Sequence, residues 1–367
     1  MAIPKTKRRK TSVDSGNGDL HTSKPTALFV PTGGRKHTLS VAIPGSIIAN
    51  AKSQETKTHL AGMIARALAV FCVDEVIVFD DDPKAFKTRV DDLHTEQFTA
   101  FTDPSHFLTH VLAYLETPPY LRKHLFPMHP NLKLAGVLPS LDMPHHLRAN
   151  EWCEYREGVV VPEGDDDGGG GGPEGGGGGG MADGVDGVSK PTIIETGLAQ
   201  PVVLHEMEIP ELARVTVKFP SKDTPEDAEP VDPNAPREEA GYYWGYSVRR
   251  AHTLSEVFTE CPFDGGYDLS FGTSERGASI ADVLAEPSLP KYEHLLVLFG
   301  GVAGIEEAVR ADKELLDKGI VPADAEKLFD YWINILPGQG SRTIRTEEAL
   351  WLGLMGLRPF VFNNGRR

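Results

Sequence analysis

The clearest hydrophobic pattern lies near the C-terminus, where a buried strand, a glycine-containing loop and an apolar helix follow one another. Residues 331–336 (YWINIL) form an almost uninterrupted apolar run, which is typical of a buried strand. Residues 337–340 (PGQG) then prevent regular structure, and the loop continues to Arg345. Thr346 is a good N-cap for a helix over 349–357 that is apolar on nearly every side. A loop rich in backbone donors between two buried elements predicts a ligand site.

The N-terminal part of the chain alternates between strand and helix patterns. Two apolar runs, 38–43 and 75–79, flank a segment with Leu60, Ile64 and Leu68 at helical spacing. Strand, helix and strand in this order predict a βαβ unit and therefore a parallel sheet. The same alternation predicts further elements at 104–115 (helix), 132–138 (strand), 267–272 (strand) and 292–299 (strand).

The pattern changes between residues 151 and 258. Short β-like runs replace the helical spacing there, at 158–161, 201–204, 213–219 and 242–248. They are separated by a glycine-rich tract at 163–190 and an acidic, proline-rich stretch at 220–240, neither of which can bury a core. We therefore predict a small β-barrel at 151–258, inserted into an α/β domain formed by 37–150 and 259–367.

Composition limits the classes of function without choosing among them. The 367 residues suit two domains, and no apolar run approaches the length of a membrane span. The first residues lack the apolar segment of a signal peptide, so we expect an intracellular protein. Residues 1–36 read as a disordered tail whose basic run, 5–10, is either a nuclear-import signal or solvated chain. The net charge of −16 means that any nucleic-acid surface must be a local patch.

Three glycine-containing loops follow predicted strands, at 271–277, 299–304 and 336–340. Ligands of open α/β sheets bind beyond the carboxyl ends of the strands, so these loops predict one pocket for a nucleoside-sized molecule. Neither GxxxxGK[ST] nor GxGxxG occurs in them, which weakens the case for nucleotide hydrolysis and for a dehydrogenase. Three isolated cysteines and scattered histidines predict no metal site.

These loops also carry a resemblance to a known family. The segments SFGTSERGAS (270–279), LFGGVAGIEEA (298–308) and NILPGQGSRTIRTEEALWLGL (334–354) resemble the SPOUT, or α/β-knot, RNA methyltransferases. Residues 39–53 fit the archaeal–eukaryotic branch that carries an OB-like insertion, and the similarity covers about 38–160 and 241–362. The resemblance implies a trefoil-knot domain with a parallel sheet, an inserted OB-like barrel, and a homodimer formed through the C-terminal helix.

The resemblance also implies roles for individual residues. S-adenosylmethionine would be bound by Gly300, Gly301, Gly304, Asn334, Leu336, Gly338, Gln339, Thr343 and Ile344. Arg276 would point at the target base or the methionine moiety, with Glu275 as a candidate proton acceptor. Three structural alternatives stay open: a tight turn at 300–301, an ion-pair role for Arg276, and an Asn334 side chain that satisfies neighbouring backbone.

A second candidate surface is the aromatic and basic segment 242–250. Tyr243, Trp244, Arg249 and Arg250 could stack bases and hold phosphates if they lie on a barrel strand. The alternative is a strand whose aromatic side chains belong to the core.

We therefore predict an S-adenosylmethionine-dependent RNA methyltransferase. The resemblance implies ribosomal RNA as its substrate, with uridine N3 as a candidate target atom. We expect it in the nucleus or nucleolus, with the cytoplasm also open. The alternative is a non-catalytic RNA-binding or spindle-associated scaffold that keeps the fold.

Overall fold

The computed structural model describes residues 31, 33–81, 98–162, 191–205, 207–222 and 224–366. The basic run at 5–10 and the glycine-rich tract at 163–190, both predicted to be disordered, lie outside these residues. No helix within the described ranges is long and apolar enough to cross a membrane.

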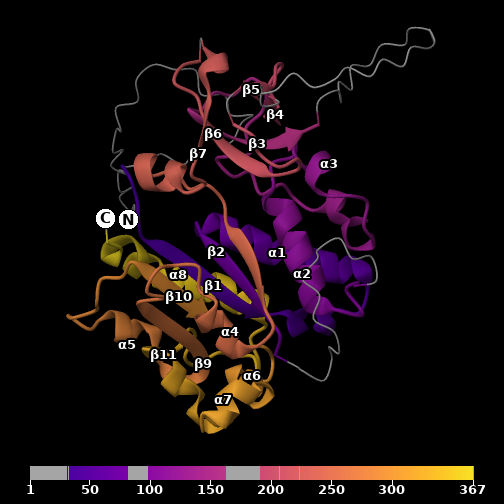
Figure 1. Cartoon of the computed structure of the whole chain (residues 1–367). Helices are drawn as coiled ribbons and strands as arrows, with labels where there is room; N and C mark the ends of the chain where they lie inside the picture. The colour runs from indigo at the N-terminus through magenta and orange to yellow at the C-terminus, as the bar shows by residue number, and fades with distance from the viewer. Residues whose placement is uncertain are drawn as a thin grey trace, which may run out of the picture.

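A six-stranded parallel sheet forms the centre of the larger domain, as predicted. Its strand order is β11-β9-β10-β1-β2-β8, and every neighbouring pair is parallel (Figure 1). The strands are β1 (Thr38–Pro44), β2 (Glu75–Phe79), β8 (Ser247–Ala251), β9 (Leu269–Ser279), β10 (His294–Leu298) and β11 (Tyr331–Asn334). Because all strands run the same way, their carboxyl ends share one edge of the sheet.

Helices cover both faces of this sheet. Each face of the sheet carries its own hydrophobic core, and successive residues of a strand alternate between them. In β2, Val76 packs in the core on one face (the first core) and Ile77 packs in the core on the other face (the second core). Helices α1 (Gln54–Val70), α2 (Pro104–Glu116), α5 (Ile280–Leu284) and α8 (Thr346–Asn364) contribute to the first core. Helices α4 (Leu254–Thr259), α6 (Ile305–Ala311) and α7 (Lys313–Asp317) contribute to the second. Burial on both faces explains why the strands read as continuous apolar runs.

Local sequence fixes the helix ends. Ser53 and Thr56 form a capping box at the start of α1, and Asp103 caps α2 by accepting from the His106 backbone N–H. Helix α8 is longer than the predicted 349–357 and continues through Pro359. A Cβ at Gly353 would lie 2.8 Å from the Phe299 ring, so this glycine lets α8 approach the sheet closely.

The insertion is a five-stranded antiparallel sheet that curves into a half-barrel, in agreement with the predicted small β domain. Its order is β5-β4-β3-β6-β7, and its interior is filled mainly by valine, isoleucine and phenylalanine side chains. The strands are β3 (Tyr155–Val161), β4 (Thr192–Glu195), β5 (Val202–Leu204), β6 (Arg214–Lys218) and β7 (Glu229–Val231).

Some predicted elements were wrong. The run 242–248 is not a barrel strand, because residues 247–251 form β8 at the edge of the parallel sheet beside β2. The insertion, as the two sheets define it, therefore ends before Ser247 rather than at residue 258. Residues 132–138 form no strand, since two 3₁₀ turns at Pro130–Leu132 and Ala135–Val137 occupy this region. The stretch 220–240 is more ordered than predicted, with β7 and a π-helical turn at Pro236–Ala240.

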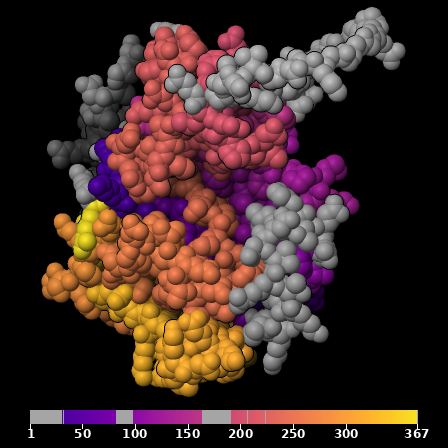
Figure 2. All heavy atoms as spheres, viewed as in Figure 1, coloured from indigo at the N-terminus to yellow at the C-terminus, as the bar shows by residue number. Residues whose placement is uncertain are grey.

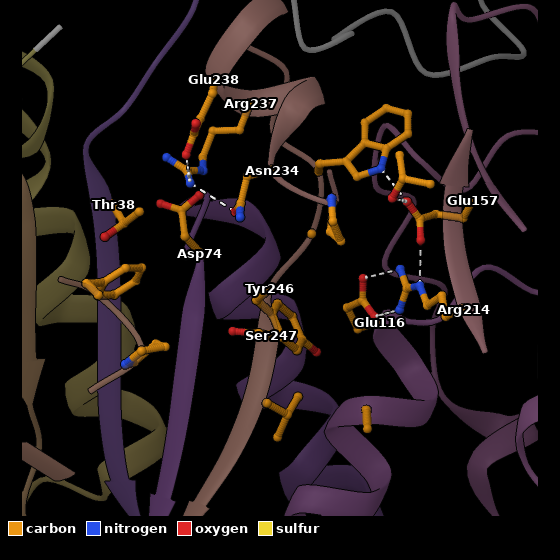
Figure 3. Close-up of a pocket in the computed structure, with 18 of the residues that line it drawn as sticks. Thr38, Asp74, Glu116, Glu157, Arg214, Asn234, Arg237, Glu238, Tyr246 and Ser247 are labelled. Atoms are coloured by element: carbon orange, nitrogen blue, oxygen red, sulfur yellow. Dashed lines mark hydrogen bonds and ion pairs between the residues drawn. The ribbon is translucent and has the colours of Figure 1, made fainter. Parts of the chain in front are cut away.

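An ion network with two buried carboxylates attaches the insertion to the larger domain. Arg214 of β6 donates to both carboxylate oxygens of Glu116, at 2.6 and 3.0 Å, and to Glu157 of β3 at 2.6 Å (Figure 3). Trp244 donates its indole N–H to the same Glu157, at 2.7 Å. A cleft of about 1110 Å³ lies between the insertion and the amino ends of β1, β2, β8 and β10. In the space-filling view the insertion lies at the opposite end of the molecule from α6 and α7 (Figure 2).

Candidate cofactor pocket and active site

A second cavity, of about 220 Å³, lies at the carboxyl edge of the sheet, on the other side from the cleft. Its walls are the excursion within β9 and the loops that follow β10 and β11, so the predicted convergence of the segments 271–277, 299–304 and 336–340 is confirmed. The lining residues are Thr273, Ser274, Glu275, Arg276, Gly300, Gly301, Val302, Ala303, Gly304, Glu306, Asn334, Ile335, Gln339, Arg342, Thr343, Ile344 and Ala349.

The first wall is an excursion within strand β9 rather than a loop after it. Along the β9–β11 pair, Trp332 lies opposite Gly272, but the next residue, Ile333, lies opposite Ala278. Residues 273–277 therefore bulge out of the β9–β11 pairing, which resumes at Ala278 while β11 advances by a single residue. A Cβ at Gly277 would lie 2.4 Å from the Ile333 backbone, so only glycine allows the chain to return there. This excursion carries the predicted residues Glu275 and Arg276 to the edge of the cavity.

Asn334, at the end of β11, connects the excursion to the C-terminal loop. Its side-chain amide donates to the Glu275 carbonyl at 2.9 Å, and its oxygen accepts from the Leu336 backbone N–H at 3.0 Å. The Asn334 side chain therefore satisfies neighbouring backbone groups, and it lines the cavity at the same time.

The second wall is the glycine loop after β10. The Gly304 N–H donates to the Gly301 carbonyl at 3.0 Å, and Gly304 has a φ of 80°, which favours glycine. A Cβ at Gly300 would lie 2.9 Å from the Gly304 carbonyl carbon, so a side chain there would open the turn. The Thr346 hydroxyl donates to the Gly300 carbonyl at 3.0 Å, which ties the start of α8 to this wall. The loop is thus both a tight turn and a pocket wall.

The third wall comes from the loop between β11 and α8. Gln339, Thr343 and Ile344 line the cavity as predicted, whereas Leu336 and Gly338 lie on the same loop outside the cavity wall. Gly338 has a φ of 75° and lets the chain turn, with no atom within 4 Å of a Cβ placed on it.

Two charged lining residues were not predicted, Glu306 and Arg342. The Glu306 carboxylate lies 3.4 Å from the Arg276 guanidinium, which joins the first wall to the second. In sequence, Glu306 looks like an ordinary acidic residue in the first turn of a helix, a position that the helix dipole already explains. The sequence feature that could have indicated a role in the pocket is its position two residues after Gly304.

The structure places the predicted RNA-binding aromatics in the interior. Tyr243 and Trp244 are 2% and 9% exposed, which matches the alternative that they belong to the core. Arg249 pairs with Glu75 at 3.1 Å, and Arg250 pairs with Asp80 and Asp103 at 3.1 and 2.9 Å. Because the two aromatic side chains are buried and the two β8 arginines are paired with carboxylates, we do not assign these four residues to the RNA surface proposed below.

The cavity fits the adenosine part of S-adenosylmethionine. Its apolar wall is formed by small and branched side chains: Val302, Ala303, Ile335, Ile344 and Ala349. The backbone of the three loops and polar side chains such as Gln339 and Thr343 provide hydrogen-bonding groups around this wall. Pockets for whole ligands measure roughly 300–1,000 Å³, so a smaller open cavity holds part of such a molecule. Among the described residues, no group of three or more side chains could hold a metal ion.

Comparison with known proteins gives a consistent result. A family model described as "Putative RNA methyltransferase" matches residues 38–357. A human protein named 28S rRNA (uridine-N(3))-methyltransferase is 42% identical over 344 residues, which cover 91% of this chain and 81% of the human protein. A Drosophila melanogaster protein with the same name is 40% identical over 329 residues, 88% of this chain and 62% of the fly protein. An uncharacterized protein of the archaeon Halobacterium salinarum is 28% identical over 327 residues, 85% of this chain and 96% of its own length.

Proposed function

We propose that this chain, which belongs to the RNA methyltransferase family matched over residues 38–357, transfers a methyl group from S-adenosylmethionine to uridine N3 in ribosomal RNA. The observation that carries the proposal is the cavity formed by the β9 excursion and the loops after β10 and β11, because it brings Arg276 beside a pocket suited to an adenosine. The substrate and the atom come from the names of relatives that are 40% and 42% identical to this chain.

The chain's own residues position the reactants. The glycine loop at 300–304 and the loop at 339–344 hold the cofactor, which supplies an electrophilic methyl group when bound. Because a sulfonium methyl group is already reactive, correct placement of the target nitrogen accounts for most of the rate increase.

Arg276 assists the uridine in losing its N3 proton. As this proton leaves, negative charge develops on the neighbouring carbonyl oxygens of the base, and a guanidinium stabilises it. The Arg276 side chain is 70% exposed at the mouth of the pocket, where a base can reach it. Glu275 remains our candidate for the proton acceptor, since it lies beside Arg276 on the same excursion.

The mouth of the pocket is also the surface where we place the RNA backbone. Arg276, Arg342 and Arg345 lie on the two loops that flank the mouth, and all three are exposed. This is the local basic patch that an otherwise acidic chain needs to bind phosphate groups.

We propose a homodimer formed through α8. Leu352, Met355, Pro359 and Phe362 are exposed at intervals of three or four residues, so they form one apolar stripe along the helix. If this stripe lies on a two-fold axis, it packs against the same stripe of a second copy of the chain, and both become buried. The resemblance to α/β-knot enzymes further supports a threaded path for the loop 336–345 and an OB-like insertion. The basic run at 5–10 supports a nuclear or nucleolar location, with a solvated tail as the alternative.

The proposal is tested by methylating ribosomal RNA from cells that lack the protein. We expect purified protein and S-adenosylmethionine to produce 3-methyluridine, detected by mass spectrometry of the nucleosides. Arg276→Ala should lower turnover by about a hundredfold or more and leave cofactor binding, measured by calorimetry, unchanged. Arg310→Ala is the matched control, because Arg310 pairs with Glu307 and does not line the pocket.

Other outcomes would change the proposal. A methylated nucleoside other than 3-methyluridine would show that the target atom is wrong. Failure of the wild-type protein to bind S-adenosylmethionine would favour the non-catalytic scaffold.

A further inference from the structure

Within the described residues, one ion pair involves the Arg276 side chain at the pocket mouth. Its side chain is long and 70% exposed, and its guanidinium lies 3.4 Å from the carboxylate of Glu306. Arginine has about 2 kcal/mol of rotamer entropy, so a largely exposed arginine without a fixed partner samples many conformations. The contact with Glu306 selects conformations in which the guanidinium crosses the mouth from the β9 excursion towards α6.

The Glu306 side chain lies against the backbone of Gly304. Its side chain is 16% exposed, whereas that of the next residue, Glu307, is 45% exposed and pairs with Arg310. The Glu306 carboxylate folds back over Gly304, and a Cβ at Gly304 would lie 2.3 Å from its Oε2 atom. The missing side chain at residue 304 therefore leaves the space that the Glu306 carboxylate occupies.

Stability alone does not account for this pair. Ion pairs with one exposed partner contribute about 0–1 kcal/mol to folding. A carboxylate beside the cofactor pocket also places negative charge near a reaction that creates an anion, which disfavours that reaction. Pairing the carboxylate with a cation offsets this effect, and Arg276 is such a cation.

We propose that Glu306 is a positioning residue that holds the Arg276 guanidinium at the pocket mouth, aligned for the carbonyl oxygens of the target base. This inference rests on the proposed methyl transfer and assigns to Glu306 a role through Arg276 rather than contact with the reacting atoms. Glu306 orders Arg276 before the RNA arrives, so the entropy of the arginine side chain is not lost during the reaction.

The test is a double-mutant cycle with single-turnover rates and cofactor affinity as readouts. We expect Glu306→Gln to lower the rate of methyl transfer roughly ten- to a hundredfold, with an unchanged dissociation constant for S-adenosylmethionine and an unchanged melting temperature. In the Arg276→Ala background, Glu306→Gln should cause no further loss, because its effect passes through Arg276. Glu306→Asp should recover part of the rate, since it keeps the carboxylate on a shorter side chain.

Glu307→Gln is the matched control and should behave like the wild-type protein. The inference would be overturned if Glu306→Gln left the rate unchanged. It would also be overturned if the variant weakened cofactor binding and its loss added fully to that of Arg276→Ala, because Glu306 would then be a ligand of the cofactor. A wild-type protein that binds the cofactor but transfers no methyl group to ribosomal RNA would refute the proposed function and this role with it.

Discussion

At the scale of single residues, two groups with strongly lowered pKa values, His146 and Glu116, lie at the junction of the two domains. His146 is partly buried, and its Nε2 lies 2.6 Å from the Glu116 carbonyl oxygen. Burial, with the nearby charge of His145, lowers the pKa of His146 to about 3. Burial alone would raise the pKa of the Glu116 carboxyl group, but Arg214 and His145 outweigh it and bring this pKa below its usual range.

His146 therefore makes folding stability depend on pH. The unfolded chain binds a proton on this histidine below about pH 6.5, whereas the folded chain keeps it neutral down to about pH 3. We expect the free energy of unfolding to decrease as the pH falls from 6.5 towards 3, by up to about 1.4 kcal/mol per pH unit from this group. Urea unfolding at pH 7.5, 6.5 and 5.5 measures the slope.

The matched variants are His146→Gln and His59→Gln. His146→Gln should flatten the dependence over this window, while the exposed His59→Gln should follow the wild-type curve. Equal slopes for His146→Gln and the wild-type protein would contradict the assignment.

At the scale of elements, helix α8 has two roles in our proposals: one side supports the core and the pocket, and the other side forms the dimer interface. Its buried side chains, including Leu350, Leu354 and Leu357, pack in the first core, and Thr346 supports the glycine loop of the pocket. Its opposite side carries the apolar stripe of Leu352, Met355, Pro359 and Phe362. Changes on the stripe should therefore affect assembly without changing the core.

Met355→Lys should convert the proposed dimer into a monomer. Met355 is 65% exposed at the middle of the stripe, so a lysine there would place a charge inside an apolar contact at little cost to the single chain. Sedimentation velocity at micromolar protein concentration measures the mass. Met128→Lys, at an even more exposed methionine before the turn Pro130–Leu132, should remain dimeric. A monomeric wild-type protein, or a Met355→Lys dimer, would argue against this interface.

At the scale of the whole molecule, the ion network at Arg214 should hold the insertion in a fixed orientation. Arg214→Ala would leave the Glu116 and Glu157 carboxylates, which are 7% and 3% exposed, without their shared cation. We expect a loss of about 3–5 kcal/mol in unfolding free energy and faster proteolysis at the junction. Lys218→Ala, on the same strand, breaks an exposed pair with Glu239 and should cost far less, because water screens exposed ion pairs. Similar losses for the two variants would mean that the network does not join the domains.

Much of this molecule could be predicted because local patterns were unambiguous. Strand β2 was predicted with its observed bounds, since both of its faces are apolar, and the glycines at 300–304 indicated a strand-end loop. The segment 242–248 was misplaced because alternating aromatics show that a chain is buried but not which sheet it joins. The pair of Arg276 and Glu306 could not be predicted, since it depends on how far the β9 excursion reaches across the sheet.

The two ends of the described chain lie side by side, and this has a practical consequence for experiments. The His37 ring contacts the Arg366 carbonyl oxygen at 2.8 Å, and the Arg366 N–H donates to the Tyr292 carbonyl at the amino edge of the sheet. The pocket lies at the carboxyl edge, so a tag, a fluorophore or a surface linker joined at the C-terminus leaves the pocket mouth accessible. Immobilised protein can therefore present its proposed RNA-binding side to solution, which suits it to direct measurements of RNA association.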